Sequence, residues 1–365
     1  MINLQFFPSR QIALYTVKLF LTRSLAVLVA LVLVLMTLDL LGESGKILGV
    51  PGNSDADLWR YVSLRLPLLI SRFMPFSVLL GTLIAFAGLN QHSEVISMKA
   101  AGISAHQILA PLIVASLGVA AIAFVFNETV VVNSARTVNA WSANDYEPVP
   151  AESGVLSNVW LLVGNDYVRA RHVGGMGPTA HMERLEIYER DGGGLRRVIK
   201  AGRADPVPGA WRLKDVRIYD SAMNLVTRVP EMTALAGVDS ARFTLAKVDP
   251  EERDFFSLQA AITEMERAGR PTDAAEAGLW HKVSSPLSTV LMPLLAAIAA
   301  FGLARSGNVL IRATIGMALG FAYFVADNFS LAMGNVGAYS PLMAAWGPFA
   351  LFLLIGETVL IRSEE

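Results

Sequence analysis

Six long apolar segments constrain this chain more than any other feature, because each has about 20 residues or more and can cross the hydrocarbon core of a bilayer as a helix. We predict membrane spans at residues 19–41, 62–89, 104–132, 279–304, 309–333 and 342–361. The composition agrees, since 53% of the residues are hydrophobic and 17% are charged, as in proteins that cross a membrane several times. No small-residue cleavage site follows the first span, so we expect that span to be retained.

Residues 133–278, between the third and fourth spans, have a different character. They hold 18 of the 30 Lys and Arg residues and 21 of the 31 Asp and Glu residues, a charge density that excludes them from lipid. Short runs in which apolar and polar residues partly alternate predict about seven β-strands, and therefore a sandwich or a jelly roll. The predicted strands are residues 155–163, 167–173, 184–190, 196–201, 211–219, 224–229 and 242–248.

The resulting fold class is an α-helical membrane protein with an inserted all-β domain. We predict three membrane helices within residues 1–132, a β-jelly-roll domain at 133–253, a helical connector at 254–278 and three more membrane helices within 279–365. Turn-forming residues 269–271 would separate the helix of the connector, predicted at 254–268, from the fourth span.

Positive charges beside the spans predict the orientation in the membrane. If the N-terminus is inside, these Lys and Arg residues fall on the cytoplasmic side: Arg10, Lys18, Arg23, Lys99, Arg305, Arg312 and Arg362. The first outer loop holds Lys46 and Arg60, and the second, residues 334–341, holds neither Lys nor Arg. We therefore predict a multi-pass membrane protein with both termini cytoplasmic and the β domain outside, which is the periplasm if the cell is Gram-negative.

A short polar segment, residues 90–107, joins the second and third spans on the predicted cytoplasmic side. Within it, Ser93 could cap a short helix that Gly102 ends, and Ser104 with Gln107 has the pattern of a capping box that opens the next helix. Two interpretations of this segment stay open at this point. It is either a connecting loop or a surface that meets a motor protein.

The chain lacks the sequence patterns of common catalytic sites. Residues 42–46 read GESGK, but Ile47 follows them and the upstream glycine is missing, so the segment is not an ATP-binding P-loop. Without cysteine there are neither disulfides nor thiolate metal sites, and the five histidines are scattered. A net charge of -1 gives no reason to expect nucleic acid as a partner. We predict a protein that is not an enzyme and has no catalytic residue, metal or cofactor of its own.

Charged residues inside the spans are the remaining signal, since each costs at least about 2.5–3.5 kcal/mol at the centre of a bilayer. Snorkelling toward the interface is enough to explain the charges of Asp39, Arg65, Glu128 and Glu357. Arg72 and Asp327 lie deeper, and such residues usually face a cavity or a partner. An outward cavity with arginines would suit an anionic amphiphile, whose acyl chains would lie on apolar walls and whose phosphates would bind guanidinium groups.

Three segments carry a resemblance to a known family: SEVISMKAAGIS at Ser93–Ser104, LWHKVSSPLSTVLMPLLA at Leu279–Ala296 and GFAYFVADNFSLAMGNVG at Gly320–Gly337. Together with the order of three spans, a β domain and three spans, they resemble the LptF/LptG (YjgP/YjgQ) family. Members of this family are the permease subunits of the lipopolysaccharide-export ABC transporter. The resemblance covers nearly the whole chain and is closer to the LptG members than to the LptF members.

The resemblance implies a permease subunit that moves lipopolysaccharide, or a related anionic glycolipid, out of the inner membrane to a periplasmic bridge. It implies three protein partners, which are an LptF-like permease, an LptB-like ATPase dimer that binds ATP and Mg²⁺, and an LptC-like membrane-anchored jelly-roll protein. The short helix would be the coupling helix, with Glu94 meeting the ATPase. The coupling residues expected are Ser93, Glu94, Val95, Met98 and Lys99.

The resemblance also implies cations that hold the phosphates of the lipid. In LptG-like members these are lysines of the first two spans, but Met36 and Gly42 stand in that neighbourhood here. The candidate lipid-binding residues are Lys46, Arg65, Arg72 and Arg136, and Asp39 and Asp327 remain as intramembrane polar residues. Lipid would enter between the first and fifth spans of opposite subunits, and ATP binding at the partner would close the cavity.

Two other functions stay open on the sequence alone. A membrane-anchored periplasmic enzyme would need a nucleophile with its base, or a metal set, and the sequence offers neither. A mechanotransmission permease would move a periplasmic domain without moving lipid, and a tightly closed bundle would favour it.

Overall fold

The computed structural model describes residues 8–147, 156–174, 180–191, 194–238, 248–267, 269–302 and 309–362. The chain divides into two compact units. The first, called the membrane unit below, comprises Met1–Glu43, Trp59–Ala135 and Pro250–Glu365. The second, called the β unit, comprises Ser44–Leu58 and Arg136–Asp249.

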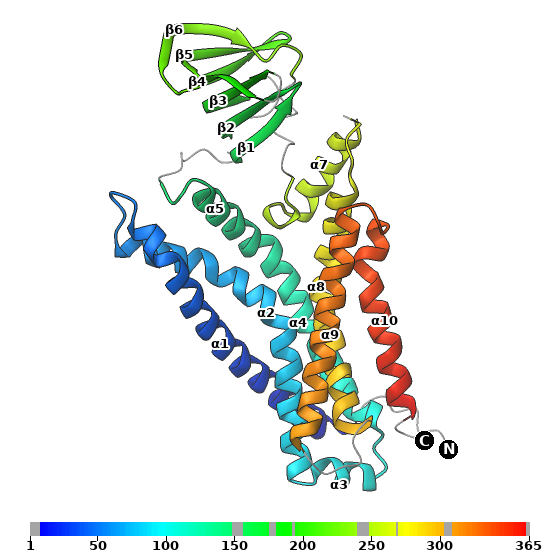
Figure 1. Cartoon of the computed structure of the whole chain (residues 1–365). Coiled ribbons are helices and arrows are strands. Elements are labelled where there is room, and N and C mark those ends of the chain that lie inside the picture. The colour runs from blue at the N-terminus through cyan, green and yellow to red at the C-terminus, as the bar shows by residue number, and fades with distance from the viewer. Residues whose placement is uncertain are drawn as a thin grey trace. The chain divides into compact units, whose positions relative to one another are not determined.

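Six helical segments of the described chain are long and apolar enough to cross a membrane, which confirms the six predicted spans. They are α1 (Arg10–Leu48), α2 (Asp55–Gln91), α4 (Ala105–Phe126) with its continuation, α8 (Asp273–Ala297), α9 (Val309–Asn335) and α10 (Pro341–Arg362) (Figure 1). Most are longer than predicted, because the helical backbone runs on into polar flanks that the apolar pattern does not mark. The predicted fold class, a helical membrane protein with an inserted all-β domain, is confirmed.

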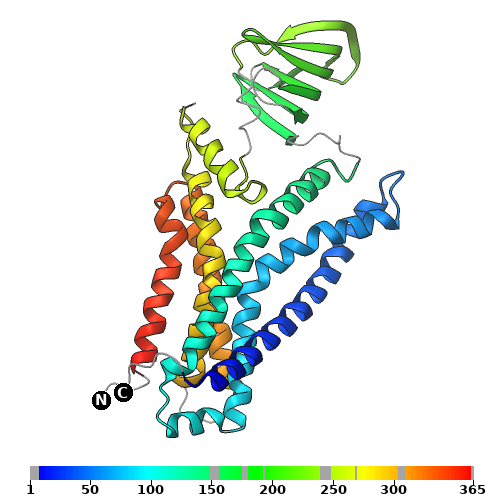
Figure 2. The ribbon, with the colours of Figure 1, turned by 180° about the vertical axis from the view of Figure 1, so that it is seen from behind.

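Helix α4 does not stop where its α-helical hydrogen bonding stops. It continues through a π-helical segment, η1 (Asn127–Val131), into α5 (Val132–Ala143), and Figure 2 shows the three as one rod. A second π-helical segment, η4 (Ile298–Gly302), prolongs α8. A π-helical turn inserts one residue into an α-helix and is frequent at functional sites.

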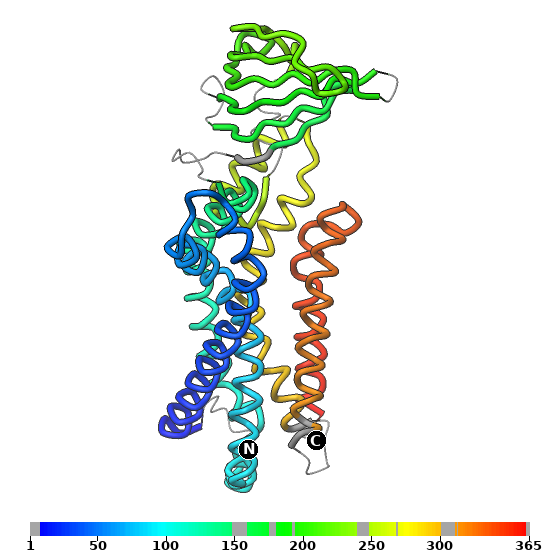
Figure 3. The backbone as a smooth tube through the Cα atoms, turned by 60° about the vertical axis from the view of Figure 1, so that its left-hand side comes forward, coloured from blue at the N-terminus to red at the C-terminus, as the bar shows by residue number. Residues whose placement is uncertain are grey.

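Helix α8 forms the centre of the membrane unit. Most of its span is buried, and Leu291, Leu294 and Leu295 are at most 2% exposed. It packs on α4, α9 and α10, and the last two lie side by side in Figure 3. Since lipid is as apolar as leucine, close packing rather than removal from water holds these helices together.

Glycines permit the closest of these approaches. A side-chain carbon at Gly81 of α2 would clash with the backbone of Ser24 on α1. At Gly320 of α9 it would clash with a methyl carbon of Leu79 on α2, whose side chain would have to move. Small residues at helix crossings commonly allow such close contact in membrane proteins, and Gly81, which meets backbone, is the position where packing requires glycine.

The β unit contains a six-stranded antiparallel sheet in which the strands follow the order of the chain. They are β1 (Leu156–Val163), β2 (Asp166–Gly174), β3 (His181–Asp191), β4 (Gly194–Val207), β5 (Ala210–Asp220) and β6 (Leu225–Ala234). Each corresponds to a predicted strand, and the seventh predicted strand, 242–248, falls almost wholly outside the described residues. Consecutive order is that of a meander, whereas a jelly roll also needs Greek-key connections, so the jelly roll stays a prediction.

A bend across the sheet explains why the alternation in the sequence is only partial. In four strands, two buried side chains are three residues apart instead of two, and the register aligns these pairs. The pairs are Ala170 and Val173, Met182 and Leu185, Ala201 and Ala204, and Leu213 and Val216. Arg184 lies within the pair on β3 and Asp215 within the pair on β5. Both take left-handed backbone angles, with φ of 49° and 52°. The register runs through this point without an inserted residue. The left-handed backbone re-aims the side chains that follow, which keeps one face toward the core.

The β4–β5 hairpin shows local turn chemistry setting the register. Its two-residue turn comprises Pro208 and Gly209, both residue types that favour turns. Gly209 has φ of 72°, a conformation that glycine adopts without strain. Trp211 follows, 1% exposed, and its indole Nε1 donates a 2.9 Å hydrogen bond to the carbonyl oxygen of Val238.

Helix α7 (Phe255–Arg267) confirms the helix predicted at 254–268. Asp254 caps it, because its Oδ1 accepts the backbone N–H of Ser257 at 3.0 Å. That hydrogen bond, with one from the Ser257 hydroxyl, holds the pKa of Asp254 below its ordinary value. The buried face of the helix comprises Leu258, Ala261, Ile262 and Met265.

Candidate functional site

The short helix predicted between the second and third spans exists as α3 (Glu94–Ala100). It ends in a Schellman motif, in which Ile103 N–H bonds the carbonyl of Met98 and Gly102 N–H bonds that of Lys99. Gly102 has φ of 83°, so its predicted role in ending the helix is confirmed. The following capping box of Ser104 and Gln107 is also confirmed.

The predicted cap at Ser93 is wrong. Its side chain makes no capping hydrogen bond, and its backbone is left-handed with φ of 57°. The chain turns sharply there between α2 and α3, and the turn orients the side chain away from the N–H groups that a cap would bind. The Ser93 carbonyl instead accepts both the N–H and the hydroxyl of Ser97 at 3.0 Å.

Helix α3 has an anchored face and an open face. Val95 is 4% exposed and belongs to the hydrophobic core of the membrane unit, and Met98 packs against that core. Ile96 is 66% exposed, and Lys99 is exposed beside it. An isolated helix of seven residues would not be stable in water, so the packing of Val95 and Met98 fixes the shape of the open face.

Glu94 lies at the first turn of α3 and is half-buried. Its Oε1 accepts a 3.2 Å hydrogen bond from the hydroxyl of Tyr15, at the start of α1. Tyr15 was not among the predicted residues, because a contact between residues 79 positions apart leaves no local signal. The carboxylate therefore links the short helix to the first membrane helix.

Asp39 and Arg65, for which snorkelling was a sufficient explanation, pair with each other. The guanidinium of Arg65 bonds both carboxylate oxygens of Asp39, at 3.1 and 3.2 Å, and the Tyr61 hydroxyl donates to Asp39 at 2.6 Å. The two side chains are 29% and 23% exposed. This bidentate pair ties α1 to α2 and leaves Arg65 less available to an anionic ligand.

The other three predicted lipid-binding cations differ from Arg65. Arg72 is exposed on α2 and has no hydrogen bond or ion pair within the described residues. Lys46 and Arg136 are exposed and belong to the β unit. Of the four predicted lipid-binding cations, Arg72 is therefore the one in the membrane unit whose guanidinium is available to an external partner.

Asp327 is paired as well. Its Oδ2 lies 3.1 Å from Nε2 of His281 on α8, and the two side chains are 16% and 24% exposed. The pair lies toward the far end of the membrane unit, meaning the end that holds the C-terminus of α4 and the N-terminus of α8. An intramembrane carboxylate needs a partner at equal depth, so the position of His281 near the start of α8 was a usable signal.

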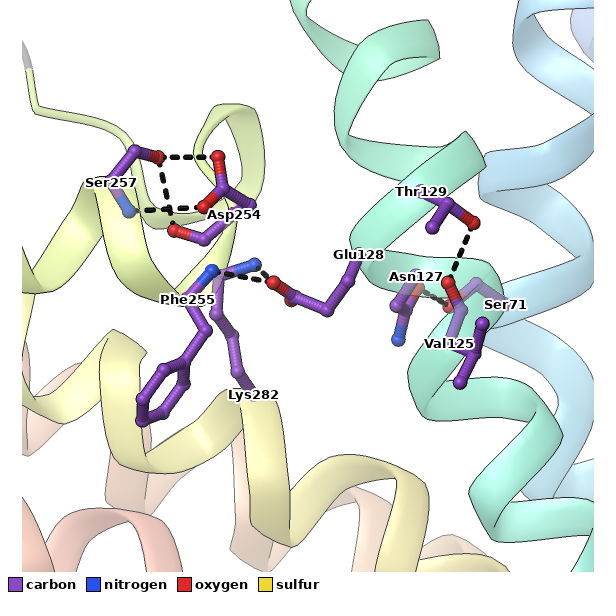
Figure 4. Close-up of polar contacts among 9 residues, drawn as sticks. All are labelled: Ser71, Val125, Asn127, Glu128, Thr129, Asp254, Phe255, Ser257 and Lys282. Carbon is purple, nitrogen blue, oxygen red and sulfur yellow. Dashed lines mark hydrogen bonds and ion pairs between the residues drawn. The ribbon is translucent and has the colours of Figure 1, made fainter.

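Glu128, in the π-helical η1, is paired as well. Its Oε1 accepts Nζ of Lys282 on α8 at 2.9 Å, and its Oε2 accepts the backbone N–H of Phe255 at the start of α7 (Figure 4). The carboxylate and ammonium side chains are only 15% and 11% exposed. The neighbouring Asn127 accepts the hydroxyl of Ser71 on α2 at 2.6 Å.

Two membrane helices present apolar rows to their surroundings. On α1, exposed side chains recur at helical spacing, with Leu21, Leu25, Val29 and Leu33 as an i, i+4 row. On α9 the row contains Met317, Phe321, Phe324, Val325 and Phe329. Such surfaces suit lipid chains or the apolar helices of a partner. No group of metal-binding side chains occurs within the residues that the structure describes.

Comparison with known proteins agrees with this arrangement over nearly the full length. The family described as lipopolysaccharide export system permease LptF/LptG matches residues 14–362. The lipopolysaccharide export system permease protein LptG of Escherichia coli K12 is 25% identical over 352 residues, which cover 93% of this chain and 94% of that protein. LptG of Haemophilus influenzae is 24% identical over 328 residues, which cover 86% and 89%. The six spans, the inserted β domain and the match across residues 14–362 show that this chain belongs to the LptF/LptG family of lipopolysaccharide export permeases.

Proposed function

We propose that this lipopolysaccharide export permease is driven by a separate cytoplasmic ATPase that binds α3, with Glu94 as the central contact. The observation that carries the proposal is the two-faced packing of α3. Val95 and Met98 join the core of the membrane unit, while Ile96 and Lys99 point outward. A force applied to the open face therefore reaches the packed helices directly, because interiors at this density do not deform locally.

The contact between Tyr15 and Glu94 supports a specific route for that force. An ATPase that binds the Glu94 carboxylate changes the hydrogen bond to Tyr15, and Tyr15 is part of α1. A coupling of this kind requires that the partner binds two states of the permease with different affinity. In this proposal the two states differ in how α1 is held.

Charge reversal at Glu94 tests the motor contact. We expect Glu94→Lys to lower the amount of ATPase that co-purifies with the tagged chain by about tenfold or more, as loss of a central charged contact does. Lipopolysaccharide at the cell surface should fall with it. Glu264→Lys is the matched control, because Glu264 is an exposed carboxylate on α7, at the other end of the membrane unit from α3 (Figure 1). Normal export and normal ATPase recovery with Glu94→Lys would refute the proposal.

The second part of the proposal concerns the lipid. Arg72 is exposed on a spanning helix and has no hydrogen bond or ion pair within the described residues, and apolar rows on α1 and α9 offer walls for acyl chains. We expect Arg72→Ala to reduce photocrosslinking of lipopolysaccharide to the chain by about tenfold. Arg72→Lys keeps the charge but loses the planar guanidinium, so its crosslinking yield should lie between those of the parent and of Arg72→Ala. Equal crosslinking by all three proteins would remove Arg72 from the lipid path.

The proposed assembly has a second, LptF-like permease facing the α1 and α9 rows, and an LptC-like protein that continues the path for lipid. It also places the β unit in the periplasm and both termini in the cytoplasm. The chain has no cysteine, so single cysteines report orientation cleanly. A membrane-impermeant maleimide should label Ser221→Cys, exposed after β5, in cells with a permeabilised outer membrane, and should not label Ser97→Cys on α3. The opposite labelling pattern would reverse the orientation.

A further inference from the structure

The π-helical segment η1 joins three other elements through two adjacent side chains. Asn127 bonds Ser71 of α2, and Glu128 bonds Lys282 of α8 and the backbone of α7. Because successive side chains of a helix point in different directions, the two residues bind partners on different sides of η1 (Figure 4). π-Helical turns are less favourable than α-helical ones and persist where they place functional groups. Here the π-helical turn places the side chains of Asn127 and Glu128 within hydrogen-bonding distance of α2, α7 and α8.

The contact with α7 differs from an ordinary surface ion pair. Phe255 is the first residue of α7, and its N–H is one of those that a helix leaves without an internal partner. Glu128 accepts this N–H, and Asp254 accepts that of Ser257. Two carboxylates at the positive end of the helix also interact favourably with its dipole. One of them belongs to α7, and the other belongs to a membrane helix.

Helix α7 is the element by which the chain returns from the β unit to α8. Its apolar face, including Leu258 and Ala261 at 0% and 3% exposed, is buried within the membrane unit. Glu128 is therefore a charged tether for an amphipathic helix that stands between the β domain and the central membrane helix in the sequence. The tether is shielded from water, since both charged side chains are at most 15% exposed.

We propose that Glu128 is a positioning residue for lipopolysaccharide export, which keeps α7 docked by accepting the N–H of Phe255 while Lys282 neutralises its charge. In this role the residue does not contact lipid. It fixes the point from which the chain leaves the β domain and enters α8. A loss of this bond frees α7 from the membrane helices, and export slows although the bundle stays folded.

Two substitutions at one position isolate the bond. Proline at the first residue of a helix is well tolerated but has no N–H, so Phe255→Pro removes the donor, and Phe255→Ala removes the same ring while keeping the donor. Both leave the pair of Glu128 and Lys282 intact, so the bundle is expected to fold in each. Each is combined with Ala261→Cys, whose thiol on the buried face of α7 is the sole thiol of the chain.

The readouts are the rate of maleimide labelling of the purified full-length chain and the lipopolysaccharide at the surface of cells that carry only the variant. We expect Phe255→Pro to label about tenfold faster than Phe255→Ala, the effect of one hydrogen bond to a charged group, and to export less. Ser71→Ala, which removes the hydroxyl bound to Asn127, should label like the parent. Equal labelling of the Pro and Ala variants would overturn the proposal, and so would faster labelling with unchanged export.

Discussion

The two ends of the membrane unit use charged side chains in opposite ways. At the α3 end, Glu94 and Lys99 stand on a helix whose other face is packed, and they are open to the surroundings. At the far end, Glu128 with Lys282 and Asp327 with His281 are paired inside the unit. Only the first arrangement places charged groups on a face that another molecule can reach.

The difference follows from what each charge would lose if its partner were removed. A buried ion whose partner is deleted keeps its desolvation cost, which makes the deletion expensive even where the intact pair adds little net stability. An exposed charge is solvated with or without its neighbour. The far end should therefore respond to mutation through stability, and the α3 end through binding.

The largest loss of stability is expected at Lys282. Lys282→Met leaves the Glu128 carboxylate 15% exposed without its cation, and we expect the free energy of unfolding to fall by about 3–5 kcal/mol. Thermal unfolding of the purified chain in detergent measures it. The double variant Glu128→Leu with Lys282→Met should recover a large part of the loss. Additive losses would show that the two charges are not coupled.

A smaller loss is expected at His281. His281→Leu removes the ring nitrogen that lies 3.1 Å from Asp327, and a buried acceptor left without its partner costs about 1–3 kcal/mol. Asn328→Ala is the control, because that exposed residue bonds only the carbonyl of its own helix at Phe324. If both variants unfold at the temperature of the parent, the pair does not fasten α8 to α9.

The β unit supplies an intermediate case in which the charges are paired but partly exposed. Hydrogen bonds from Arg203 and Lys214 hold the pKa of Asp205 below its ordinary value of 3.8. A lowered folded-state pKa adds stability above the unfolded-state pKa, and this stability is lost as the pH falls through the folded-state value. We expect Asp205→Asn to cost about 0–1 kcal/mol at pH 7, and nothing once acid has protonated the carboxylate of the parent. Unfolding temperatures at both pH values test this, and a difference that persists in acid would contradict it.

The smallest change in stability is expected at Glu94, together with the largest change in transport. Glu94→Lys should shift the free energy of unfolding by no more than about 0.5 kcal/mol, as for other surface substitutions, although export is lost. Thermal unfolding of the isolated chain, beside the export assay, makes the measurement. A Glu94→Lys chain that unfolds as early as Lys282→Met would erase the contrast between the two ends.

Local patterns in the sequence were enough to predict much of this molecule. The six spans, the end of α3 at Gly102, the capping box at Ser104 and the helix after Asp254 depend on residues within a few positions of each other. The cap at Ser93 failed because the chain reverses there with a left-handed backbone, which no residue type in the segment announces.

The pairings between helices were not predictable in the same way. Tyr15 and Glu94 are 79 residues apart, and Glu128 and Lys282 are 154 apart. Snorkelling explained Glu128 equally well from the sequence, because position along a span does not show which neighbouring helix a side chain faces. The depth of a charged residue in the membrane offers partial information, since such a charge needs a partner at its own level. Matching depths along the spans would have selected His281 as the partner of Asp327.

The order of the strands has a consequence for how the chain is made. Each strand of the described sheet pairs with the next one in sequence, so the sheet can form from nearby contacts as soon as its strands have been synthesised. The contact of α4 with α8 spans more than a hundred residues and must wait until the insert has been synthesised. We expect chains truncated before α8 to protect their strands from protease, and unprotected strands would contradict this. Biosynthesis then passes through a state in which a finished β domain is attached to half of a membrane bundle.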